Sequence, residues 1–100
     1  MDKITFDFND KTAVITGGAQ GFGLDIAKRF LKSGAKVIIW DIDPKMLDKA
    51  IKDLNDPNLS SNIVDVSNYN EVEKSVSEIT KNTNIDILIN NAGITGPTAT

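Results

Sequence analysis

Three closely spaced glycines are the first residues whose type and spacing suggest chemistry. Gly17, Gly21 and Gly23 lie in the run Thr16-Gly17-Gly18-Ala19-Gln20-Gly21-Phe22-Gly23, between the apolar residues 13–15 and an amphipathic stretch. A glycine turn between a strand and a helix brings an anion to the helix N-terminus, where free N–H groups and the helix dipole favour it. We therefore predict a dinucleotide pyrophosphate site here; a purely structural turn is the alternative. Gly17 would make the tight turn, Gly21 would admit the phosphates, and Gly23 would let the helix pack closely on the strand.

A single carboxylate provides the second candidate for cofactor binding. Asp41 follows the apolar run 37–40 and stands 20 residues after Gly21. In that position it can accept hydrogen bonds from both hydroxyls of an adenosine ribose, while its charge would repel a 2′-phosphate. No lysine or arginine lies at 18–20 or 42–43 to bind such a phosphate. The sequence therefore predicts NAD rather than NADP.

The residue types that are missing exclude several classes of function. The 100 residues contain no cysteine and no histidine, so they can build no disulfide, no thiolate or imidazole metal site and no Ser-His-Asp triad. A net charge of −3 argues against nucleic-acid binding, which needs clustered positive charge. No lysine followed by serine or threonine closes the glycine loop, which argues against a P-loop enzyme. The acids among residues 1–8, and the lack of a long apolar stretch, predict a soluble, cytoplasmic protein without a membrane partner.

The elements that position these residues recur at a steady spacing. Four apolar runs are expected to be strands, at residues 13–16, 37–40, 63–64 and 85–89. Counted from Ala13, Val37, Ile63 and Ile87, the steps are 24, 26 and 24 residues, which leaves room for a helix in each connection. Continuous apolar runs are typical of strands buried on both faces of a parallel sheet. We therefore predict an α/β fold, the β-α-β-α-β-α-β portion of a Rossmann-type doubly wound parallel sheet.

The three connecting segments have the pattern of amphipathic helices. Their apolar faces are formed by Ile26, Ala27, Phe30 and Leu31, by Leu47, Ala50, Ile51 and Leu54, and by Tyr69, Val72, Val76 and Ile79. Asp43 followed by Pro44 is typical of a helix start, and Ser67 or Asn68 with Glu71 predicts another. We assign all three faces to core packing, together with Trp40, Met46 and Phe30 as core or core-rim residues.

Three motifs, taken in order, resemble those of the short-chain dehydrogenase/reductase family. Residues 16–23 match the family's TGxxxGxG motif, with three residues between the first two glycines. Asp65-Val66 matches the position whose carboxylate faces the adenine amino group, and Asn90-Asn91-Ala92-Gly93 matches the NNAG motif. Each motif lies at the carboxyl end of a predicted strand, where open α/β sheets bind ligands. The resemblance covers essentially the whole chain, although Phe22 stands where the family commonly has an aliphatic residue.

The resemblance implies which residues contact the cofactor. Gly17, Gln20, Gly21 and Phe22 would line the phosphates and nearby ribose with backbone groups. Asp41 and Ile42 would hold the adenosine ribose, Asp65 and Val66 the adenine, and Asn91, Ala92 and Gly93 would run beside the cofactor, whereas Asn90 would steady the sheet. With Gly23, the predicted cofactor-binding residues are therefore Gly17, Gln20, Gly21, Phe22, Gly23, Asp41, Ile42, Asp65, Val66, Asn91, Ala92 and Gly93.

The family's catalytic residues have no counterpart in this sequence. That family uses a serine and a Tyr-x-x-x-Lys pair, but the only tyrosine here, Tyr69, is followed four residues later by Glu73. Because Tyr69 falls on the apolar face of a predicted helix, we assign it to the core and name no catalytic residue. We expect residues 1–100 to be the cofactor-binding portion of a longer single-domain enzyme, homo-oligomeric (a dimer or tetramer) when complete.

The resemblance implies an NAD(H)-dependent oxidoreductase that interconverts an alcohol and a ketone by hydride transfer. The tail Gly93-Ile94-Thr95-Gly96-Pro97 resembles 3-oxoacyl-carrier-protein reductases. Sugar and polyol dehydrogenases are equally compatible, and Asp41 argues mildly against the reductases, which usually prefer NADP. Two alternatives remain open: a non-catalytic NAD-binding module, and an S-adenosylmethionine methyltransferase, against which the glycine spacing and residues 90–93 count.

Overall fold

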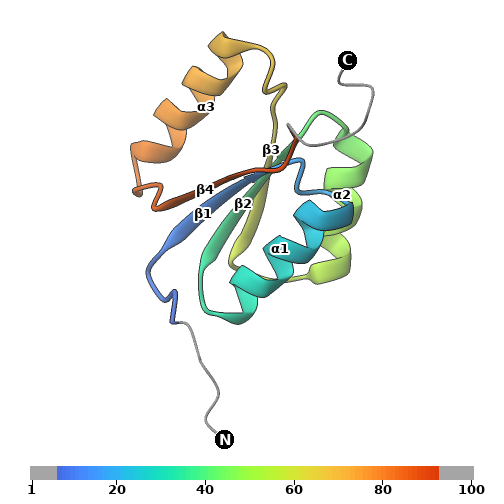
Figure 1. Ribbon diagram of the computed structural model, residues 1–100, viewed down its shortest axis with the longest axis vertical. Coiled ribbons are helices and arrows are strands. Elements are labelled where there is room, and N and C mark those ends of the chain that lie inside the picture. The colour runs from blue at the N-terminus through green and yellow to red at the C-terminus, as the bar shows by residue number, and fades with distance from the viewer. Residues whose placement is uncertain (1–6, 93–100) are drawn as a thin grey trace, which may run out of the picture.

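The computed structural model describes residues 7–92, which form a parallel sheet covered by helices on both faces (Figure 1). The elements in chain order are β1 (Thr12–Thr16), α1 (Gly21–Lys32), β2 (Lys36–Asp41), α2 (Pro44–Leu54), β3 (Leu59–Ile63), α3 (Tyr69–Thr80) and β4 (Ile87–Asn90). The four strands lie in the order β3-β2-β1-β4, and every neighbouring pair is parallel. Helices α1 and α2 cover one face and α3 covers the other (Figure 1). The predicted fold class, an α/β Rossmann-type sheet, is confirmed.

Strand β1 forms the centre of the sheet because it pairs on both sides. Its residue Val14 lies beside Ile38 of β2 and beside Leu88 of β4. All five residues of β1 are buried, as the continuous apolar run predicts for a strand covered on both faces. The turn that follows β1 therefore starts from the buried centre of the sheet.

Two apolar clusters form the core, one on each face of the sheet. On the face covered by α1 and α2, the cluster consists of buried residues from the helices, the sheet and the adjoining loops: Ile15, Ala19, Ala27, Ala35, Val37, Ile39, Leu47, Ala50 and Leu59. Beneath α3 lie Val14, Trp40 and Val64, with Val72 and Ile79 of the helix packed against them. Trp40 is a core residue, and Phe30 and Met46 lie at the rim, as predicted.

Side chains at the predicted positions begin two of the helices. The Asp43 Oδ1 atom accepts hydrogen bonds from the backbone N–H of Lys45 at 2.9 Å and of Met46 at 3.3 Å, with Pro44 as the first residue of α2. The Asn68 Oδ1 atom accepts from the backbone N–H of Glu71 at 3.2 Å and begins α3. Such caps satisfy N–H groups that the first helical turn leaves unpaired.

The third strand is not where the sequence pattern predicts it. The pattern predicts a strand at residues 63–64, but β3 spans Leu59–Ile63 and only Leu59 is buried within it. Backbone pairing with β2, from Val37 beside Leu59 to Asp41 beside Ile63, fixes this edge strand although its side chains are mostly polar. Val64 follows the strand and is buried under α3. Strand β4 is shifted too, to Ile87–Asn90, because the carboxylate and N–H of Asp86 bond the backbone of Thr12 before the strand begins.

The assignment of Tyr69 to the core is wrong. Its side chain is 73% exposed, and its hydroxyl lies 3.4 Å from the Glu73 Oε2 atom. Tyr69 is the first residue of α3 and precedes the turn in which Val72 packs on the sheet, so helical periodicity overestimates the length of the packed face. Within residues 7–92, no helix is long and apolar enough to cross a membrane, and no group of three or more acidic side chains is placed to hold a metal ion.

Candidate functional site

A cavity of about 810 Å³ lies where the strands end at their carboxyl termini, within the size range of ligand pockets. It is lined by Gly17, Gln20, Gly21, Phe22, Trp40, Asp41, Ile42, Asp43, Val64, Asp65, Val66, Asn91 and Ala92. Every predicted cofactor-binding residue between 7 and 92 lines this cavity except Gly23, and Gly93 lies outside the described residues. Residues separated by up to 75 positions in the sequence are thus brought to one side of the sheet.

The glycine turn depends on small residues at two positions for different reasons. Gly21 has a φ of +60°, and a Cβ built on it would meet nothing within 4 Å, so its missing side chain leaves the approach to the turn open. Gly23 instead sits against the backbone: a Cβ there would overlap the Gly17 carbonyl oxygen and lie 2.8 Å from the Asn91 Nδ2 atom. Gly23 therefore permits the close packing of α1 on the turn, although it does not line the cavity.

The first turn of α1 leaves its N–H groups available. Gln20 precedes the helix with an extended backbone and makes no side-chain cap, and the turn contains no acidic residue. Among the described residues, the N–H groups of Gly21, Phe22 and Gly23 donate no hydrogen bond. Unpaired N–H groups at the positive end of a helix dipole form a site for an anion.

The carboxylate of Asp41 is fixed between two loops. Its Oδ2 atom accepts from the Ala19 N–H at 3.4 Å, and its Oδ1 atom accepts from the N–H groups of Ile42 at 2.8 Å and Asp43 at 3.3 Å. Among the described residues, the charged side chains that line the cavity are all acidic, namely Asp41, Asp43 and Asp65. This part of the cavity therefore attracts hydroxyl and amino groups and repels an added phosphate.

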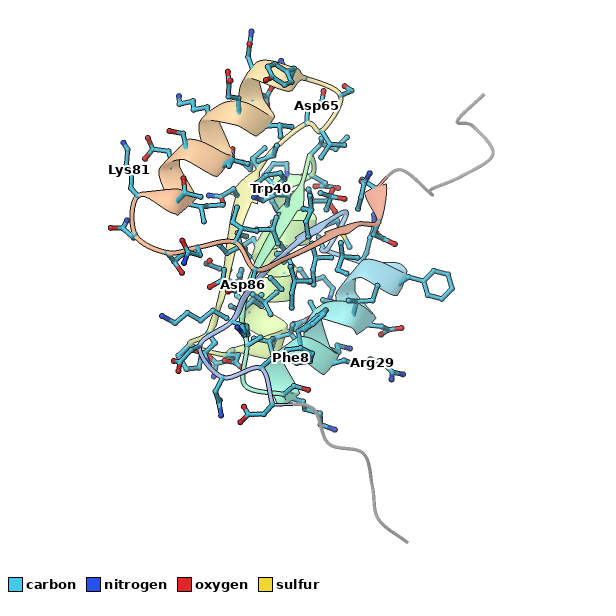
Figure 2. All side chains as sticks on the ribbon, turned by 60° about the vertical axis from the view of Figure 1, so that its left-hand side comes forward. Phe8, Arg29, Trp40, Asp65, Lys81 and Asp86 are labelled. Carbon is cyan, nitrogen blue, oxygen red and sulfur yellow. The ribbon has the colours of Figure 1, made fainter. Side chains whose placement is uncertain are left out.

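Asp65 lies in the loop that joins β3 to α3 (Figure 2). Its Oδ1 atom accepts from the Ser67 hydroxyl at 2.6 Å and from the Ser67 N–H at 2.9 Å. These hydrogen bonds, that of the hydroxyl first, hold the pKa of the Asp65 carboxyl below its usual value because they stabilise the charged form. Ile42 and Val66 add exposed apolar surface beside these carboxylates.

The end of β4 is held against the end of β1 by side chains from both strands. The buried Thr16 hydroxyl lies 3.0 Å from the Asn90 Oδ1 atom and accepts from the Ala92 N–H at 3.0 Å. The Asn91 side-chain amide donates to the Gly17 carbonyl oxygen at 3.1 Å. Asn90 thus contacts the central strand, as predicted, while Asn91 and Ala92 line the cavity.

Three lining residues are absent from the predicted set. The sequence pattern assigns Trp40 to the core, Val64 to a strand and Asp43 to a helix start. Trp40 and Asp43 have those roles as well, whereas Val64 follows β3 and is buried under α3. Each of the three is the direct sequence neighbour of a predicted site residue, and this adjacency is the signal that could have revealed them. The indole Nε1 atom of Trp40 is buried without a hydrogen-bond partner among the described residues. Within residues 7–92, no tyrosine, lysine or serine lines the cavity, and Tyr69 lies outside it.

Comparisons with known proteins show to which family this chain is related. Residues 11–100 match the family profile described as short chain dehydrogenase. The chain is 40% identical over 90 residues to the 3-oxoacyl-[acyl-carrier-protein] reductase FabG of Chlamydia muridarum (strain MoPn / Nigg), an alignment that covers 86% of this chain and 36% of that protein. This chain therefore spans about a third of the length of the curated relatives that it matches.

Solved structures show the same relationship. The 2-keto-3-deoxy-D-gluconate dehydrogenase from Streptococcus agalactiae superposes with a TM-score of 0.81 at 34% identity, over 92% of this chain and 36% of that one. A variant of actinorhodin polyketide ketoreductase with NADPH superposes with a TM-score of 0.76 at 28% identity, over 82% of this chain and 33% of that one.

Proposed function

Because this chain belongs to the short-chain dehydrogenase/reductase family, we propose that it supplies the NAD site of an oxidoreductase that interconverts an alcohol and a ketone. The observation that carries the proposal is the single cavity that gathers the glycine turn, Asp41, Asp65 and Asn91. A bound nicotinamide would supply the hydride chemistry, and the described residues would bind and orient the dinucleotide.

Three groups of residues support a dinucleotide with its pyrophosphate, adenosine ribose and adenine in this cavity. The N–H groups at the start of α1, beside the open approach over Gly21, suit the pyrophosphate. The Asp41 carboxylate, fixed by backbone N–H groups, suits the hydroxyls of the adenosine ribose. After β3, the Asp65 Oδ2 atom and the Val66 N–H have no hydrogen-bond partner among the described residues, so one acceptor and one donor are left for adenine. The nicotinamide half would lie toward Phe22, Asn91 and Ala92.

The charge of the cavity favours NAD over NADP. Asp41 would face a 2′-phosphate, and the described residues that line the cavity include no lysine or arginine to neutralise it. The related actinorhodin ketoreductase is solved with NADPH, and affinities of this chain for NAD and NADP distinguish the two cofactors. The relatives include a 3-oxoacyl-carrier-protein reductase and a sugar-acid dehydrogenase, both consistent with a carbonyl substrate.

Titration of the protein with NAD and with NADP tests the proposal. Trp40 is the only tryptophan and lines the cavity, so its fluorescence should change as the site fills. We expect NAD to bind at least about tenfold more tightly than NADP, because the 2′-phosphate of NADP would face the Asp41 carboxylate without a cation to neutralise it. Tighter binding of NADP would reject the choice of NAD, and binding of neither by calorimetry would reject the function. Ketone-dependent consumption of NADH would then test the reaction itself.

A further inference from the structure

A carboxylate on α3, outside the cavity, holds the loop between β3 and α3 (residues 64–68). The Glu71 Oε1 atom accepts from the backbone N–H of Asp65 at 3.1 Å, and its Oε2 atom accepts from the Asn68 side-chain amide at 3.2 Å. The backbone N–H of Glu71 donates in return to the Asn68 Oδ1 atom. One side chain thus ties the start of the loop to its end.

This arrangement differs from an ordinary helix capping box. In a capping box, a glutamate at this position bonds the backbone N–H of the N-cap residue, here Asn68. The Asn68 N–H instead donates to the Asp65 carbonyl oxygen at 2.9 Å, and Glu71 reaches three residues further back to the Asp65 N–H. The contact therefore acts on the loop that lines the cavity as well as on the helix start.

The hydrogen bonds of the loop leave one backbone donor free. The N–H groups of Val64, Asp65, Ser67 and Asn68 donate to the Asp41 carbonyl, to Glu71, to the Asp65 carboxylate and to the Asp65 carbonyl, respectively. Within residues 64–68, the Val66 N–H alone donates to none of the described residues. Beside it, the Asp65 Oδ2 atom remains as an acceptor, because Ser67 bonds only Oδ1.

We propose that Glu71 is a positioning residue for base specificity: by holding the Asp65 N–H, it makes the loop present one acceptor and one donor, which select a 6-aminopurine. The inference rests on the proposed dinucleotide site. Adenine offers an amino donor beside a ring-nitrogen acceptor, which complements Asp65 Oδ2 and the Val66 N–H. Hypoxanthine offers a carbonyl acceptor beside an N–H donor, which reverses the pattern and sets its carbonyl against a carboxylate. Without Glu71, the Asp65 N–H loses its partner and the path of the loop is no longer fixed, so the Asp65 Oδ2 atom and the Val66 N–H are held less firmly in the adenine-selecting arrangement.

The test compares the affinities of NAD and nicotinamide hypoxanthine dinucleotide for four proteins: wild type, Glu71→Ala, Glu71→Gln and the control Glu73→Ala. Glu73 lies on the same helix, and among the described residues its side chain has a hydrogen bond only with the Tyr69 hydroxyl. In Glu71→Ala we expect the preference for NAD to fall about three- to tenfold, the range of one net hydrogen bond. Glu71→Gln should retain part of the preference because its amide oxygen can still accept from the Asp65 N–H. Glu73→Ala should retain all of it.

The ratio of the affinities for NAD and nicotinamide hypoxanthine dinucleotide distinguishes a positioning role of Glu71 from a purely stabilising role. If Glu71→Ala lowers the melting temperature and weakens both dinucleotides equally, Glu71 only stabilises the helix start and the inference is overturned. An unchanged ratio in Glu71→Ala with unchanged stability overturns it too. If the wild-type protein binds neither dinucleotide, the proposed function fails and the inference fails with it, whereas wild-type binding with an unchanged ratio defeats the inference alone.

Discussion

The Asn91 side-chain amide donates a hydrogen bond of 3.1 Å to the Gly17 carbonyl oxygen, which fastens the end of β4 to the turn that follows β1. Asn91 is buried, and the adjacent Ala92 N–H donates to the Thr16 hydroxyl. Two loops separated by more than 70 residues are therefore held as one unit before any ligand arrives. A site whose walls are already fixed loses less entropy when it binds.

Replacing Asn91 should loosen that unit. Asn91→Ala leaves the Gly17 carbonyl oxygen without its side-chain donor, which should lower the free energy of unfolding by about 1–3 kcal/mol. Urea denaturation measures this change. The matched control is Asn62→Ala, at an exposed asparagine of β3 with no side-chain hydrogen bond among the described residues. Equal unfolding free energies for the two variants would show that the Asn91 hydrogen bond contributes nothing.

The sequence predicts the fold well where burial and capping act locally. The apolar runs of β1 and β2, and the caps Asp43 and Asn68, lie where their patterns indicate. The prediction fails at β3, because an edge strand is fixed by backbone pairing and needs no apolar pattern. It fails at Tyr69, because periodicity does not show where a helix extends past the residues that pack beneath it.

The site is predictable for the same reason that the topology is. Once the strands are parallel, residues that follow them must meet at one edge of the sheet, and the predicted residues between 7 and 92 meet there except Gly23. The hydrogen bond from the Asp65 N–H to Glu71 is different. It depends on the path of a five-residue loop, and the sequence pattern alone indicates only a helix cap with Asn68.

Gly21 and Gly23 should respond differently to the same substitution. Gly21→Ala places a Cβ in open space at a positive φ, so the fold should lose only about 1–2 kcal/mol from backbone strain. The same Cβ stands in the approach to the α1 N–H groups. NAD affinity should therefore fall by at least about tenfold, because displacing the charged phosphates from these donors costs more than one net hydrogen bond. Calorimetric titration and thermal unfolding measure the two effects.

Gly23→Ala provides the contrast. Its Cβ would overlap the Gly17 carbonyl oxygen, so helix α1 must shift, and we expect a loss of about 2–3 kcal/mol in unfolding free energy. A Gly21→Ala protein with normal NAD affinity would show that the turn is not the pyrophosphate site. A Gly23→Ala protein as stable as wild type would contradict the close packing.

Asp41 should determine the cofactor preference. Asp41→Ala removes the acceptor for ribose hydroxyls and the charge that opposes a 2′-phosphate, so NAD should bind about tenfold or more weakly. NADP should bind no worse, and the ratio of the two affinities should approach one. Asp41→Asn is the control, because its amide oxygen can still accept from the Ile42 N–H without the charge. Unchanged affinities for both cofactors in Asp41→Ala would remove Asp41 from the site.

Ser67 should control the titration of Asp65. The Ser67 hydroxyl and N–H bond the Asp65 Oδ1 atom and lower the pKa of that carboxyl from its ordinary value of 3.8. Because the folded-state pKa lies below the unfolded one, these bonds stabilise the fold fully above the unfolded pKa and lose their effect as pH falls through the folded pKa. Ser67→Ala removes the hydroxyl hydrogen bond, which is the larger of the two causes of the lowered pKa, so the pKa of Asp65 should rise toward 3.8. The variant should also be less stable than wild type at neutral pH. That stability difference should shrink in acid. Carboxyl NMR titration of Asp65 with urea unfolding at several pH values measures both effects, and an unmoved Asp65 midpoint in Ser67→Ala would contradict the assignment.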